Sequence, residues 1–115
     1  MSLYLYYANH QQFPSITRTS AKSPVLILFG GPTCSVCKSP SLKLDEFLPK
    51  ELPLIQAAYV DCQASPEISA QYGVFSLPVI KVYMGNQLVA ERAGVFSLQQ
   101  LLQDLERIYS IWKSV

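Results

Sequence analysis

The stretch VLILFGGPTCSVCK, residues 25–38, joins a strand pattern to a pair of cysteines. Its first part, Val25–Phe29, is an unbroken β-branched and aliphatic run, which is typical of a strand buried on both faces. Gly30-Gly31-Pro32 breaks that strand, and we expect a helix from about Cys34 to about Leu48. The cysteines would therefore lie where a buried strand gives way to a helix.

The length and composition of the chain predict one folded domain. The chain has 115 residues, of which 50% are hydrophobic and only 15% are charged, so it can bury a core and is not disordered. Its net charge is +1, and no basic run appears, which argues against a nucleic-acid partner. No apolar run approaches the roughly 20 residues that a membrane span needs. We therefore expect a single domain over residues 1–115 with no membrane partner.

The cysteine count and the first residues of the chain indicate the cellular compartment in which the protein works. Three cysteines always leave one unpaired, so they do not make a disulfide framework. The start MSLYLYYANHQQ has neither a basic region nor a small-residue cleavage site of the kind that a secretory leader carries. We expect a reducing compartment, the cytoplasm.

The remaining patterns alternate strands with helices along the chain. We expect strands at residues 3–8, 54–61, 78–84 and 87–93, a short helix around Phe13, and a helix starting at Ser65-Pro66. Gly85-Asn86 reads as a type II′ hairpin turn. Ser97 and Gln100 form a capping box for the final helix. This order predicts an α/β fold with a mixed central sheet and helices on both faces.

The final helix has the clearest pattern in the chain. Its apolar residues recur at helical spacing and trace a single stripe, which we expect to face the core. The stripe consists of Leu98, Leu101, Leu102, Leu105, Ile108, Tyr109 and Trp112.

The pair Cys34 and Cys37 has the spacing and the setting of a redox site. At a helix N-terminus the free N–H groups and the positive end of the dipole stabilise a thiolate, so the thiol pKa falls. Cys37 lies one turn after Cys34 and is close enough to form a disulfide with it. We expect Cys34 to be the nucleophile and Cys37 the resolving thiol. Lys38 adds a weak favourable charge.

Two alternatives remain for these cysteines. They can be small apolar side chains packed in a core. They can also join Cys62 and His10, the only histidine, in a Cys₃His zinc site, although such ligands usually come in two short knuckles. An iron–sulfur cluster with four thiolates is excluded because the chain has three. We expect Cys62 itself to be an inert, partly buried thiol, with a regulatory disulfide as the alternative.

The chain resembles the thioredoxin family over nearly its whole length. The resemblance rests on VLILFGGPTCSVCK, on YVD (59–61), on YGVFSLPVIKVYMGNQLV (72–89) and on RAGVFS (92–97). It implies a thioredoxin-like fold with a central sheet of four to five strands. It also implies a cis peptide bond before Pro78, a substrate segment paired to the backbone of Leu77, and a groove lined by Gly94 and Thr33.

The chain departs from the family pattern around this site. Thr33 stands where the family usually has tryptophan, and Ser35-Val36 separates the cysteines. Leu28 and Ala57 replace a buried aspartate and its lysine partner, and the proline that kinks the helix is displaced to Pro40. Since that carboxylate is thought to handle the proton of the resolving thiol, we expect slower resolution by Cys37.

The sequence therefore predicts a thiol–disulfide oxidoreductase that exchanges dithiols and disulfides with protein substrates. It needs no metal or organic cofactor, because the cysteine pair itself carries two electrons. We expect a monomer that is served by an upstream thiol reductase. The alternative is a thioredoxin-fold binding or adaptor module that clamps partners without turnover.

Overall fold

The protein was analysed as a computed structural model that describes residues 5–8, 24–31, 38–52, 55–85, 87–94 and 97–114. The described strands form one sheet in the order β1-β3-β2-β4-β5. They are β1 (Leu5–Ala8), β2 (Val25–Gly30), β3 (Gln56–Asp61), β4 (Val79–Met84) and β5 (Gln87–Ala93). β3 is parallel to β1 and β2, whereas β4 is antiparallel to β2 and β5. The predicted mixed sheet is thus confirmed with five strands, while the helix expected around Phe13 lies outside the described residues.

β2 is the centre of the sheet and of the core. Each residue of Val25–Phe29 has 0% of its surface exposed. The side chains alternate between two apolar clusters, with Leu26 and Leu28 in one and Val25, Ile27 and Phe29 in the other. The unbroken apolar run is therefore explained, as predicted, by burial on both faces.

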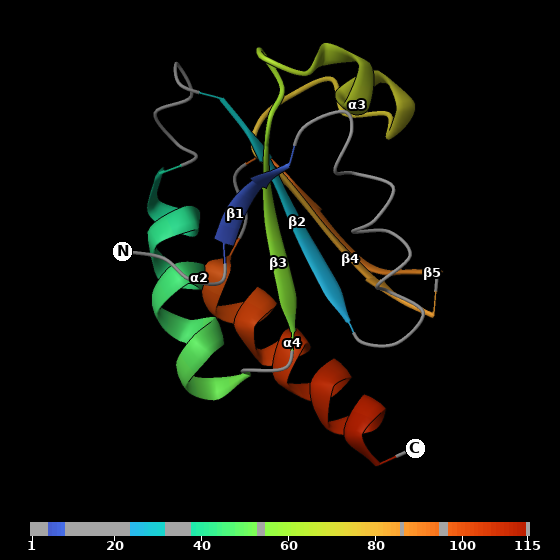
Figure 1. Ribbon diagram of the computed structural model, residues 1–115. Coiled ribbons are helices and arrows are strands. Elements are labelled where there is room, and N and C mark those ends of the chain that lie inside the picture. Colours follow the sequence, from blue (N-terminus) through green and yellow to red (C-terminus); the bar gives the residue numbers. More distant parts are fainter. Residues whose placement is uncertain are drawn as a thin grey trace.

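Helices cover both faces of the sheet (Figure 1). On one face, α2 (Lys38–Glu51) and α4 (Leu98–Lys113) bury leucines against the cluster that contains Leu28. On the other face, α3 (Pro66–Gln71) buries Ile68 against the cluster that contains Phe29. This two-sided arrangement is the predicted fold class.

The end of α2 differs from the prediction. The helix continues past Leu48 and through Pro49 to Glu51, and the N–H of Leu52 donates to the carbonyl oxygen of Leu48 at 2.9 Å. A proline this close to a helix end removes few helical hydrogen bonds. Burial of Leu48 and Leu52, at 1% and 4% exposed, favours one more turn. Pro40 lies in the first described turn, and its kink stays a prediction.

The start of α3 also differs in detail. Pro66 occupies the first turn as predicted, but Ser65 makes no side-chain capping bond. The preceding turn is held instead by Asp61, whose Oδ1 accepts from the N–H groups of Gln63 and Ala64 at 2.9 and 3.1 Å. An aspartate at a strand end commonly orders a turn in this way.

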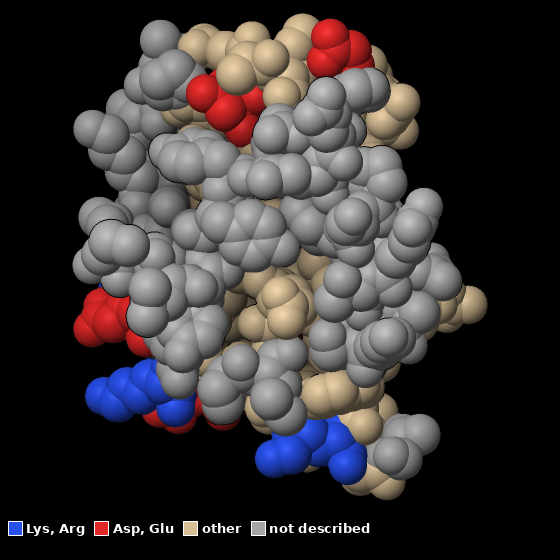
Figure 2. Space-filling view, viewed as in Figure 1, with Lys and Arg blue, Asp and Glu red and all other residues tan. Residues whose placement is uncertain are grey.

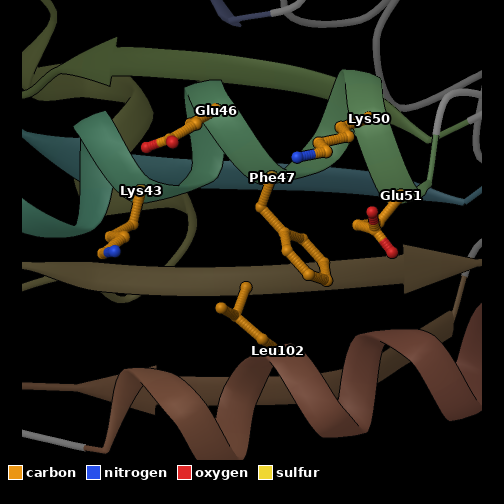
Figure 3. A pocket seen from close by; sticks show the side chains of 6 residues that line it. All are labelled: Lys43, Glu46, Phe47, Lys50, Glu51 and Leu102. Atoms are coloured by element: carbon orange, nitrogen blue, oxygen red, sulfur yellow. The ribbon is translucent and has the colours of Figure 1, made fainter.

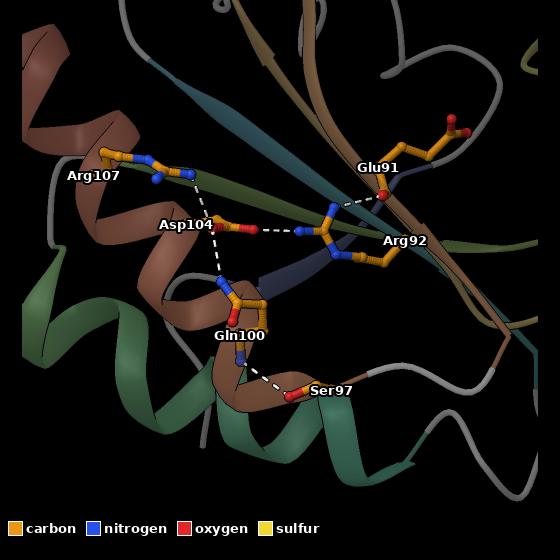
Figure 4. Close-up of polar contacts among 6 residues, drawn as sticks. All are labelled: Glu91, Arg92, Ser97, Gln100, Asp104 and Arg107. Carbon is orange, nitrogen blue, oxygen red and sulfur yellow. Dashed lines mark hydrogen bonds and ion pairs between the residues drawn. The ribbon is translucent and has the colours of Figure 1, made fainter.

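The hairpin and the final helix lie where the sequence places them. Gly85 has φ of 60°, as the first position of a primed hairpin turn requires; Asn86 lies outside the described residues, so the turn type stays a prediction. Ser97 Oγ accepts from the Gln100 N–H at 3.2 Å. The other half of the expected capping box is absent from the described contacts, because Gln100 Nε2 donates to Asp104 at 3.2 Å (Figure 4).

An open groove of about 250 Å³ lies between α2 and α4 (Figure 3). Its lining is Lys43, Glu46, Phe47, Lys50, Glu51 and Leu102. Among the described helices, none is long and apolar enough to span a bilayer.

Candidate functional site

The candidate site lies at the end of the sheet where β2 and β3 finish and β4 begins, the upper end in Figure 1. Phe29 pairs with Val79, and Gly30 pairs with Asp61. The N–H of Cys62 donates to the Gly30 carbonyl oxygen at 2.9 Å, which holds the two parallel strand ends together. The segment that follows Gly31 therefore leaves the sheet beside the start of β4.

The predicted redox pair sits in that segment. Thr33, Cys34 and Cys37 lie outside the described residues, as does His10, so their roles and the zinc alternative stay predictions. Both flanks of the segment are described: Gly31 directly follows β2, and Lys38 is the first described residue of α2. Cys34 is three residues beyond Gly31 in the sequence.

Leu77 and Pro78 lie at the same end of the sheet, next to Gly31. The Leu77–Pro78 peptide bond is cis, the geometry that the resemblance implies. Pro78 is buried and its carbonyl oxygen accepts from the N–H of Gly94 at 2.9 Å. A Cβ built on Gly31 would lie 3.6 Å from Leu77 Cδ1. The cis-proline loop is thus packed against the residue from which the cysteine segment departs.

Gly94 lies next to Pro78 at the end of β5. Its φ is 68°, a left-handed conformation that side chains disfavour. A Cβ at this position would meet nothing within 4 Å among the described residues. The groove-lining role of Gly94 stays a prediction.

The positions of the missing acid–base pair are apolar and buried. Leu28 is 0% exposed and Ala57 is 1% exposed, and both belong to the cluster under α2 and α4. Neither side chain can accept or release a proton. Among the described residues, the buried charged groups are Lys81 and Asp104.

These two buried charges were missed by the sequence analysis. Lys81 Nζ donates to the Tyr72 carbonyl oxygen at 2.8 Å and pairs with Glu91 at 3.1 Å. Asp104 pairs with Arg92 and Arg107. The available signals were a lysine inside the apolar strand VIKVYM and an aspartate three residues after Leu101, on the buried side of the helix.

Cys62 follows β3 at the same end of the sheet and is partly exposed. Partial burial raises the pKa of its thiol; a hydrogen bond with Ser69 opposes this rise, and the Asp61 carboxylate adds to it. The Cys62 side chain is a free thiol. A thiol with a raised pKa is a poor nucleophile at neutral pH, which fits the inert role expected from the sequence.

The groove between α2 and α4 is separate from this site. Its lining comes from residues 43–51 of α2 and from Leu102 of α4. None of the residues that flank the cysteine segment or Pro78 contributes to that lining.

Comparison with known proteins finds a matching protein family and related sequences. The family model described as Thioredoxin matches residues 5–107. The chain is 31% identical to a thioredoxin of Haemophilus influenzae over 98 residues, which cover 83% of this chain and 88% of that protein. It is 30% identical to thioredoxin 1 of a Nostoc species over 84 residues, 73% of this chain and 78% of that one.

A solved structure supports the same fold. The crystal structure of oxidised thioredoxin O2 from Arabidopsis thaliana superposes with a TM-score of 0.83. The match covers 92% of this chain and 95% of that chain at 20% sequence identity. The predicted thioredoxin-like fold is thereby confirmed.

Proposed function

Because the chain belongs to the thioredoxin family of thiol–disulfide oxidoreductases, we propose that Cys34 and Cys37 carry its exchange reaction with protein disulfides. The observation that supports this assignment is the packing of the cis-Pro78 loop against Gly31. That contact brings a substrate-binding backbone next to the start of the cysteine segment. Thr33, Leu77, Pro78 and Gly94 are proposed to shape the groove.

The activation of Cys34 follows from its place before α2. Orphan N–H groups and the dipole at a helix N-terminus favour an anion there. The thiolate form of Cys34 is then available near neutral pH, and the thiolate is the attacking species. No metal or organic cofactor enters the reaction.

The exchange proceeds in two balanced steps. The Cys34 thiolate attacks one sulfur of a substrate disulfide, forms a mixed disulfide and releases the other substrate sulfur as a thiolate. The Cys37 thiolate then attacks Cys34 Sγ, forms the Cys34–Cys37 disulfide and releases the second substrate thiolate. Two electrons pass from the cysteine pair to the substrate, and the protons of the two enzyme thiols end on the two substrate thiols.

In this proposal the second step, resolution by Cys37, is slower than in thioredoxins that keep the buried aspartate and lysine. Leu28 and Ala57 supply no proton acceptor beneath the site, so Cys37 loses its proton to water or to the departing substrate thiolate. The Ser35-Val36 pair and Thr33 make the motif atypical. An upstream thiol reductase returns the disulfide to the dithiol state.

The setting of the enzyme is proposed from its composition. Three cysteines favour a reducing compartment, and we assign the protein to the cytoplasm as a monomer with one domain over residues 1–115. The absence of a basic run in the sequence argues against nucleic acid as a partner.

Insulin reduction by dithiothreitol tests the assignment. We expect the full chain to accelerate precipitation of insulin, Cys34→Ser to abolish the effect, and Cys62→Ser to retain it as the matched control. Cys37→Ser should accumulate a mixed disulfide that is visible by mass spectrometry. Full activity in Cys34→Ser would overturn the role of Cys34, and an inactive wild type would favour the binding module.

A further inference from the structure

Phe75 is the most exposed large apolar side chain among the described residues. It has 88% of its surface exposed, whereas its neighbour Val74 is only 6% exposed. The N–H of Val74 donates to the Ser69 carbonyl oxygen at 2.8 Å, and Pro78 is buried on the other side of the loop. The backbone is therefore anchored on both sides of Phe75 while the ring points into solvent.

Phe75 belongs to the loop that leads to Pro78 in the proposed site. Phe75 lies three residues before Pro78, and Leu77, between them, lies close to Gly31. In the part of the chain that is described, no hydrogen bond engages the backbone groups of Phe75, Ser76 or Leu77. An extended substrate segment can pair with these groups, which places its side chains beside the ring.

The stretch of sequence that carries Phe75 has no charged residue with which to select a partner. Residues 68–80, which run from α3 through Phe75 into β4, contain no Asp, Glu, Lys or Arg. Figure 2 shows the described Lys and Arg side chains gathered toward the lower end of that face, away from the site end. Asp61 and the exposed Glu67 of α3 are acidic residues at the site end, and Asp61 Oδ1 accepts two backbone N–H groups of its own turn.

We propose that Phe75 is a specificity-determining residue that selects substrates with an apolar side chain close to the reacting cysteine. The side chain packs on the ring while the substrate backbone pairs with the loop. Aromatic side chains are enriched at the energetic centres of protein interfaces, and they bind apolar groups without electrostatic help. This inference rests on the proposed function and adds the substrate class.

The test compares disulfide-linked peptides that differ at one position. One peptide has leucine two residues before its cysteine and its partner has serine there. We expect the full-length wild type to reduce the leucine peptide with a kcat/KM about three- to tenfold higher. Phe75→Ala should bring the ratio to about one, and Phe75→Leu should keep most of the preference.

Leu88→Ala is the matched control. Leu88 is 45% exposed and pairs with Tyr83 at the hairpin end of β5, far along the strand from Gly94. We expect this variant to keep the wild-type ratio. A preference that survives in Phe75→Ala overturns the role of Phe75 while leaving the proposed function intact. Wild type that reduces neither peptide overturns the proposed function, and this inference with it.

Discussion

Arg92 of β5 and Asp104 of α4 form an ion pair that ties the edge strand to the final helix (Figure 4). The Asp104 side chain is 13% exposed and the Arg92 side chain is 30% exposed. Asp104 also accepts from Gln100 at 3.2 Å and from Arg107 at 3.1 Å. A carboxylate in an otherwise apolar helix face is tolerated because three donors compensate its lost hydration.

Asp104→Ala should lower the free energy of unfolding by about 2 kcal/mol, because it leaves the Arg92 guanidinium partly buried without its partner. Urea unfolding followed by circular dichroism measures the change. Glu106→Ala, an exposed acid on the same helix, is the control and should change little. Equal effects of the two substitutions would contradict a structural role for the pair.

Lys81 fixes the start of the loop that carries Phe75. Its Nζ lies 2.8 Å from the Tyr72 carbonyl oxygen, and its side chain is 10% exposed. Lys81→Met should destabilise the chain by about 1–2 kcal/mol, since that carbonyl loses its donor. It should also speed hydrogen exchange at the Val74 amide.

Glu91→Gln is the matched comparison for Lys81. Glu91 is 46% exposed, so water screens its ion pair with Lys81. Loss of this ion pair in Glu91→Gln should lower the free energy of unfolding by less than about half the effect of Lys81→Met. If Glu91→Gln is as damaging as Lys81→Met, the carbonyl contact is not the main role of Lys81.

A comparison of alanine variants at Gly94 and Gly85 distinguishes the effect of backbone strain from an effect on substrate binding. The two glycines have φ values of 68° and 60°, and neither has a described atom within 4 Å of a built Cβ. Alanine at either position should therefore cost about 1–2 kcal/mol of stability. Only Gly94→Ala should also lower kcat/KM for insulin, by about tenfold, because a misplaced substrate reacts slowly. Equal activity in the two variants would remove Gly94 from the groove.

Cys62 should react slowly with iodoacetamide. Its pKa is raised above the ordinary value of 9.0 by burial, so its thiolate is scarce at neutral pH. In a variant with Cys34 and Cys37 changed to serine, the alkylation rate should keep rising above pH 9.0. Adding Ser69→Ala removes the opposing hydrogen bond and should slow alkylation further; a faster rate would contradict this account.

Tyr83 makes stability depend on alkaline pH. Burial, with smaller effects of Tyr72 and Glu91, raises the pKa of Tyr83 from 10.0 to about 12. The unfolded chain therefore ionises first, and this contribution to stability is complete below pH 10.0 and is lost toward pH about 12. The urea midpoint of the wild type should fall more steeply over that window than that of Tyr83→Phe. Parallel curves would show that Tyr83 titrates normally.

The sequence predicted those parts of the fold that local periodicity decides. Val25–Phe29 is buried throughout, and the stripe of α4 buries Leu101, Leu105 and Tyr109. Lys81 and Asp104 were missed because their burial depends on partners that are distant in sequence or in another element. The end of α2 was wrong by three residues because tertiary burial of Leu52 outweighs the local effect of Pro49.

At the site, the motifs predict which residues take part, whereas the exposure of each side chain can be known only from the structure. The cis bond before Pro78 was implied by the resemblance, and the structure contains it. Phe75 follows the buried Val74 and lies two residues before Leu77, so the apolar character of the sequence gives no reason to expect its ring in solvent.

The central position of β2 has a consequence during synthesis. One edge of β2 pairs with β3, and the other edge pairs with β4, which is synthesised later because it begins only at Val79. A nascent chain that stops earlier exposes an unpaired edge on its most apolar strand, and such edges promote aggregation. A fragment of residues 1–78 should therefore collect in inclusion bodies under conditions in which the whole chain remains in the supernatant.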